Sequence, residues 1–120
     1  MAMIQDALQG IQRVPDPHFP YAPPDWSRES AVETARQERL TLGDDHWQVV
    51  RGLQEFFARH EYGTVNLREL YDALEEKFHH KGGMKHLHTL FPGGPIAQGC
   101  RLAGLKPPTG AIDPSFGSVA

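Results

Sequence analysis

The feature that most constrains this chain is a series of short amphipathic segments, each ended by glycine or proline. The clearest runs from Asp44 to about His60 and carries its apolar side chains at helical spacing. These are Trp47, Val50, Leu53, Phe56 and Phe57. Thr41, followed three residues later by an acid, resembles a capping box and predicts the start of this helix. Such segments must bury their apolar stripes by packing as helices on one another.

Four further helices are predicted, over residues 27–39, 66–78, 84–90 and 95–104. Ser27 or Ser30 can cap the first, Pro95 suits the first residue of the last, and Gly104 can end it. The segment 66–78 directs five residues inward: Leu67, Leu70, Tyr71, Leu74 and Phe78. About five short helices with brief connections predict a mainly α fold, a small irregular bundle whose helices cross at steep angles.

Prolines divide the chain into three regions. Residues 1–25 carry five prolines and are predicted to form an extended N-terminal arm, for which a β-hairpin is one form. Phe19, Tyr21 and Trp26 are expected to hold this arm on the helical domain, residues 26–104. Residues 105–120 are rich in proline and glycine and predict a flexible C-terminal arm.

Length and composition narrow the class of protein. The 120 residues suit one domain, and the net charge of −3 argues against general affinity for nucleic acid. The sequence contains no long apolar run for a membrane span and no signal-peptide pattern at its start. The single cysteine, Cys100, fits a reducing compartment, so a cytoplasmic location is expected.

Several motifs occur in an order that resembles a known family. They are Pro24-Asp25-Trp26, Asp45-His46-Trp47, Arg68, Leu90-Phe91-Pro92-Gly93-Gly94-Pro95, Gln98-Gly99-Cys100 and Ala103-Gly104-Leu105-Lys106-Pro107-Pro108-Thr109-Gly110. The set resembles the DsrC/TusE family of sulfur-relay proteins, also called the gamma subunit of dissimilatory sulfite reductase. The resemblance covers residues 19–110.

The resemblance implies a helical fold with a C-terminal arm that performs the chemistry. In this family a cysteine near the end of the arm accepts persulfide sulfur, and a second cysteine lies in the last helix. In the DsrC branch both cooperate with sulfite reductase. In the TusE branch the arm cysteine alone passes sulfur toward 2-thiouridine in tRNA.

This sequence departs from that pattern at the arm. Cys100 matches the helix cysteine, but Ala111 stands where the arm cysteine is expected, and nine more residues follow it. A methyl group cannot carry sulfur. The leading hypothesis is therefore a protein that docks on a sulfite reductase or sulfurtransferase-type partner as a non-relay or regulatory variant, and is not an enzyme by itself.

The candidate site residues come from the last helix and the arm. Cys100 is the candidate sulfur-bearing thiol, although its spacing from Ile96 and Ala103 also puts it on the apolar face, where a thiol is inert. The predicted partner-binding residues are Arg101, Lys106, Pro107, Pro108, Thr109, Gly110, Ala111 and Phe116.

Two other functions stay open. One is a sulfurtransferase that uses Cys100 alone. The other is a DNA-binding regulator in which two short helices and a basic cluster imitate a helix-turn-helix. That cluster contains Lys77, His79, His80, Lys81, Lys85 and His86. His86 and His88 point about 200° apart on a helix, so they cannot share one metal ion. No metal or cofactor is expected.

Overall fold

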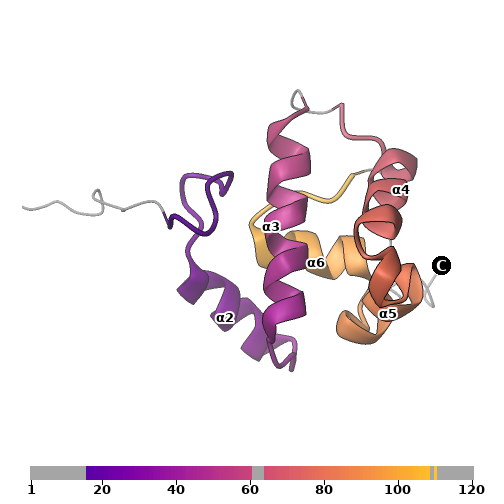
Figure 1. Cartoon of the computed structure of the whole chain (residues 1–120). Coiled ribbons are helices and arrows are strands. Elements are labelled where there is room, and N and C mark those ends of the chain that lie inside the picture. The colour runs from indigo at the N-terminus through magenta and orange to yellow at the C-terminus, as the bar shows by residue number, and fades with distance from the viewer. Residues whose placement is uncertain (1–15, 61–63, 109, 111–120) are drawn as a thin grey trace, which may run out of the picture.

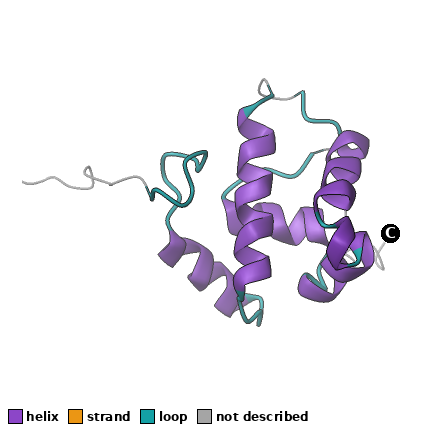
Figure 2. Cartoon of the chain, in the orientation of Figure 1, coloured by secondary structure: helices purple, strands orange, loops and turns teal. Residues whose placement is uncertain are grey.

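The computed structural model describes residues 16–60, 64–108 and 110; residues 1–15, 61–63, 109 and 111–120 lie outside the described part. The described residues form α2 (Arg28–Gln37), α3 (Asp44–Ala58), α4 (Leu67–Lys77), the 3-10 helix η2 (His79–Lys81), α5 (Gly83–Leu90) and α6 (Pro95–Ala103). These elements are all helical, and no strand occurs in the described residues (Figure 2). The predicted mainly helical class is confirmed.

The helix α6 occupies the centre of the bundle. It crosses behind α3, with α2 on one side and the pair α4 and α5 on the other (Figure 1). Every residue of α6 except Arg101 is buried. Gly99 permits the close approach to α3, because a β-carbon there would lie only 2.8 Å from Leu53 Cδ1. The helices α3 and α6 cross steeply, as the short helices predicted (Figure 1). The absence of a side chain at Gly99 allows them to pack closely at the crossing.

The start of α3 differs from the prediction. Gly43, not Thr41, is the N-cap residue. The reason is a tertiary contact of the buried residue His46: its Nδ1 accepts from the Gly43 N–H at 3.1 Å, while its Nε2 lies 2.9 Å from the Leu90 carbonyl oxygen. The buried face of α3 therefore differs from the predicted one. It consists of His46, Val49, Val50, Leu53 and Gln54, while Trp47 is only half-buried.

The chain leaves α2 through a left-handed residue. Ser27 caps the start of the helix by accepting from the Ser30 N–H, as predicted. At the other end Arg39 has φ 60°, and the Leu40 N–H donates to the Ala35 carbonyl at 2.8 Å. This is the backbone pattern of a Schellman motif, in which glycine is the common residue at the left-handed position.

The segment 16–27 forms successive turns, and no strand occurs in its described residues 16–25. Its prolines withhold the N–H groups that a sheet would need, which explains the absence of a hairpin there. Phe19 and Trp26 are buried as predicted, but Tyr21 is 40% exposed. The Trp26 indole N–H donates to the Leu102 carbonyl at 2.8 Å, so this segment is fixed to the end of α6.

The inward face of α4 is narrower than predicted. Leu70, Leu74 and Phe78 are buried, whereas Tyr71 is 39% exposed and places its hydroxyl 3.4 Å from His88 Nε2 of α5. Tyr71 lies on the flank of the stripe that α3 and α5 cover. None of the described helices is both long and apolar enough to cross a membrane.

Candidate functional site

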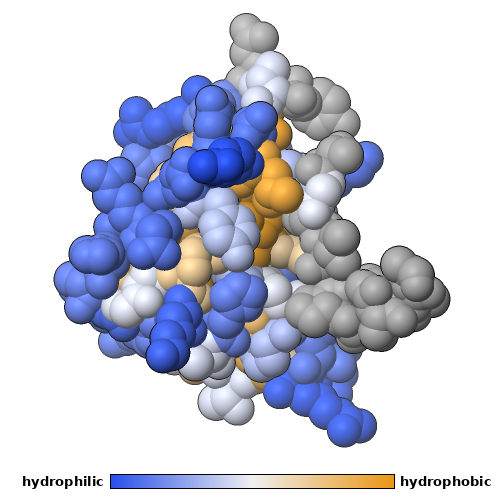
Figure 3. Space-filling model, turned by 90° about the vertical axis from the view of Figure 1, so that its right-hand side faces the viewer, coloured by the Kyte–Doolittle hydropathy of each residue, from blue (hydrophilic) through white to orange (hydrophobic). Residues whose placement is uncertain are grey.

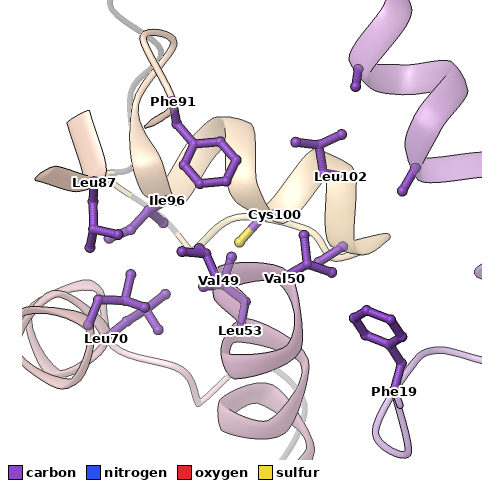
Figure 4. Close-up of a cluster of buried hydrophobic side chains, with 14 of the residues drawn as sticks. Phe19, Val49, Val50, Leu53, Leu70, Leu87, Phe91, Ile96, Cys100 and Leu102 are labelled. Carbon is purple, nitrogen blue, oxygen red and sulfur yellow. The ribbon is translucent and has the colours of Figure 1, made fainter. Parts of the chain in front are cut away.

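Cys100 lies in the middle of the hydrophobic core. Its side chain is 0% exposed, and Figure 4 shows the sulfur surrounded by apolar side chains of α3, α6 and the loop before α6. Burial raises the pKa of the Cys100 thiol from its ordinary 9.0 to about 12, and the positive charge of Arg101 offsets only part of this. At neutral pH that shift leaves about a thousandfold less thiolate than an ordinary cysteine would have.

Arg101 holds α6 against the end of α2. Its Nε and Nη2 both donate to the carboxylate of Glu38 at 2.8 Å, and Gln98 Nε2 donates to the same carboxylate at 2.8 Å. The Gln98 amide oxygen accepts from the Gly93 N–H at 3.0 Å, which fixes the loop before α6. The Arg101 side chain is 33% exposed, so this predicted partner-binding residue also has a structural contact within the chain.

The last helix, α6, ends at Gly104, the residue predicted to stop it, and the base of the C-terminal arm follows. Gly104 has φ 77°, and the Leu105 N–H returns to the Cys100 carbonyl at 2.8 Å. A β-carbon at Gly104 would lie 3.0 Å from Trp26 Cδ1, so glycine suits this position both in backbone conformation and in space. The indole of Trp26 thus packs against Gly104, where the arm leaves the core.

The described part of the arm runs along a groove of about 840 Å³. Tyr21 and Pro23 contribute to one side, the end of α3 and the start of α4 to another, and residues 104–108 to a third. Within the arm, Lys106 is exposed, and Pro107 and Pro108 are half-buried. In Figure 1 the arm passes behind α3 toward the start of α4.

The structure separates the predicted site residues into two groups. Lys106, Pro107 and Pro108 lie together on the groove, while Cys100 is in the core and is not among the residues that line it. Gly110 is exposed beside Leu67. The predicted residues Thr109, Ala111 and Phe116 lie outside the described residues.

The basic cluster on η2 and α5 is partly neutralised. Asp45 at the start of α3 accepts from Lys81 Nζ at 2.7 Å and lies 3.0 Å from His86 Nε2. These contacts hold the pKa of the Asp45 carboxyl below its usual range. His79, His80 and His88 are exposed. The face of the molecule seen in Figure 3 is mostly hydrophilic, with an apolar patch near its centre. Across the described ranges, no three potential metal ligands are grouped closely enough to hold an ion.

Several residues of the groove were not predicted as site residues. Tyr21, Gln54, Phe57 and Leu67 come from three separate segments of the chain. One signal was available, because Gln54 follows Val50 by four residues and therefore interrupts the apolar face of α3 with an amide. The others look like ordinary core residues in the sequence.

Comparisons with known proteins agree on one family. A family model described as "DsrC like protein" matches residues 13–112. Sulfurtransferase TusE of Photorhabdus laumondii is 38% identical over 90 residues, which cover 73% of this chain and 79% of the relative. Sulfurtransferase TusE of Salmonella choleraesuis is 40% identical over 89 residues, covering 72% of this chain and 80% of the relative.

A solved structure agrees with this result. The NMR structure of Allochromatium vinosum DsrC matches with a TM-score of 0.61 and 37% sequence identity, over 73% of this chain and 79% of the other. This protein is therefore similar to the chain both in sequence and in the arrangement of its helices. The chain belongs to the DsrC-like protein family, as its ordered motifs predicted.

Proposed function

We propose that this chain docks on a sulfite reductase or sulfurtransferase-type partner through its last helix and C-terminal arm, and that it does not relay sulfur itself. One observation carries the proposal. The only thiol in the sequence, Cys100, is fully buried with a pKa of about 12, and Ala111 stands at the position of the arm cysteine. A chain without a reactive thiol can still occupy the partner's binding site as a regulatory or competing member of the family.

The base of the arm supports a docking role. Lys106 presents its charge to solvent beside Pro107 and Pro108, whose fixed φ angles lower the entropic cost of ordering the arm on a partner. The adjoining groove of about 840 Å³ offers apolar surface next to the arm. The relatives' name, Sulfurtransferase TusE, gives the class of reaction in which such a partner would act.

The partner's affinity for two forms of the chain tests this proposal. We expect a persulfide-donating sulfurtransferase or sulfite reductase from the same organism to bind the full chain. Its affinity should fall at least about tenfold for a chain that stops after Gly104, since the arm contacts are then lost. Titration calorimetry measures both.

A matched control separates docking from thiol chemistry. Cys100→Ala removes the thiol and keeps a small apolar side chain in the core, so it should bind within about twofold of the original chain. Equal binding by the full and shortened chains would rule out the arm as the docking element. Loss of binding in Cys100→Ala, with the fold intact by circular dichroism, would instead favour a role for the thiol.

A further inference from the structure

The groove beside the base of the arm contains an unsatisfied hydrogen-bond acceptor. Gln54 is 1% exposed and is one of the residues that line the groove. Its Nε2 donates to the Ala103 carbonyl at 3.1 Å. In the described part of the chain, its Oε1 is the one buried side-chain nitrogen or oxygen without a hydrogen-bond partner. A buried amide oxygen is usually paired, so this atom indicates that a bound group with an N–H or O–H belongs next to it.

The walls of the groove are mainly apolar and partly aromatic. Phe57 of α3, Leu67 of α4 and Leu105 of the arm pack on the core and also line the groove. Tyr21, which is 40% exposed, contributes to another side. Flat aromatic rings pack well on such side chains, and a groove of about 840 Å³ has the size of a small-molecule site.

The charges around the groove favour an anion. Among the described residues that line it, Lys106 and His60 can carry positive charge and none is acidic, although the whole chain has a net charge of −3. Asn66, the N-cap residue of α4, also lines the groove, so the positive end of that helix dipole lies at its edge. Together these positive groups attract a carboxylate or a similar anion.

One class of molecule matches all three features. Because Gln54 Oε1 is buried, the donor must be a small group, such as the N–H of a flat ring, that can enter between the apolar walls. We propose that the groove binds a small aromatic anion that carries an N–H or O–H group. Its ring packs on Phe57 and Leu67, and its donor bonds to Gln54 Oε1. Its anionic group faces Lys106 and the start of α4. A bare ion would leave the apolar walls uncovered, and a purely apolar molecule would leave Oε1 unpaired.

Occupancy of this site bears on docking. Lys106 and Pro107 line the groove and also belong to the surface proposed for the partner. A bound molecule therefore competes with the partner for that surface. Only this consequence rests on the proposed function. The binding itself is a property of the isolated chain and can be tested without any partner.

Binding of indole-3-acetate to the full chain tests the site. This probe has a flat aromatic ring, an N–H and a carboxylate. In amide NMR titrations it should shift the side-chain amide of Gln54 and the backbone amides of Phe57 and Leu67, with a dissociation constant of about 1 mM or below. Resonances of α2 should stay in place, because none of the described lining residues belongs to that helix.

Two related molecules separate the contributions of the donor and the charge. Benzothiophene-3-acetate keeps the ring shape and the carboxylate but has a sulfur in place of the N–H, so it should bind at least about fivefold more weakly. Tryptamine keeps the indole N–H and reverses the charge, so it should bind at least about tenfold more weakly.

Three variants assign these effects to residues. Gln54→Leu removes the acceptor, so it should bind the two acids with affinities equal within about twofold. Lys106→Gln should weaken binding of indole-3-acetate about threefold. Lys85→Gln removes the same charge from an exposed residue outside the groove and should leave binding unchanged.

The alternatives give distinct results. Equal affinity of the original chain for the two acids would overturn the proposal, as would equal weakening by Lys106→Gln and Lys85→Gln. The absence of groove shifts at about 10 mM indole-3-acetate would also overturn it. Groove resonances that move only when a sulfurtransferase-type protein is added would assign the groove to the partner. That result would overturn the small-molecule site and leave the proposed docking function intact.

Discussion

Replacing Ala111 by cysteine is expected to give a chain that accepts one sulfur atom from a persulfide donor much faster than the original chain does. An exposed thiol with a pKa near 8.5 is about one-tenth ionised at pH 7.5. Cys100, with its pKa of about 12, is ionised to only about 3 parts in 100,000 and is also shielded from the donor. The sulfur uptake rate should therefore rise at least about a thousandfold, as measured by intact mass spectrometry.

A second cysteine variant is the control for position. Ala120→Cys also places a thiol in the segment after the arm base, so a small-molecule persulfide donor should load both variants. A sulfurtransferase that recognises the arm should load Ala111→Cys and not Ala120→Cys. Loading of Cys100 in the original chain, at a rate like that of Ala111→Cys, would mean that α6 opens readily and that Cys100 can act alone.

Replacing Trp26 by alanine is expected to lower the free energy of unfolding by about 3–5 kcal/mol. The indole is buried with its ring centroid 4.9 Å from that of Phe19, and its N–H is bonded to the Leu102 carbonyl at 2.8 Å. Its removal leaves a cavity between the N-terminal turns and the point where Gly104 ends α6. Urea unfolding followed by circular dichroism measures the loss.

Trp26→Phe separates packing from the hydrogen bond. Phenylalanine keeps most of the aromatic contact with Phe19 but cannot donate to Leu102, so its cost should be only about 1–2 kcal/mol. A loss under about 1 kcal/mol for Trp26→Ala would contradict the anchoring of the N-terminal turns on α6.

The ends of α6 were predictable because two residues have narrow conformational demands. Pro95 suits the first turn of a helix, and Gly104 accepts the left-handed φ of 77° that ends it. The start of α3 was not predictable in the same way. Its N-cap, Gly43, is set by His46, whose other nitrogen contacts Leu90 across 44 residues of sequence. A cap that depends on such a contact leaves no local pattern.

In the candidate site, too, local spacing predicted some features and only the folded chain shows the others. The apolar spacing around Cys100 correctly indicated that it lies on the buried face of the last helix. The partner of Arg101 could not be inferred, because Glu38 is 63 residues away. The groove was also hidden, since its walls come from the N-terminal turns, α3, α4 and the arm, and only the folded chain brings them together.

We propose that this protein binds the sulfur-transfer machinery without carrying sulfur. The most direct test measures sulfur transfer from a persulfide-donating sulfurtransferase to a family member that retains the arm cysteine, both from the same organism, with this chain added in excess. We expect that transfer slows, that this chain gains no mass, and that a chain ending at Gly104 has no effect. Unchanged transfer, or sulfur found on Cys100 of this chain, would contradict it.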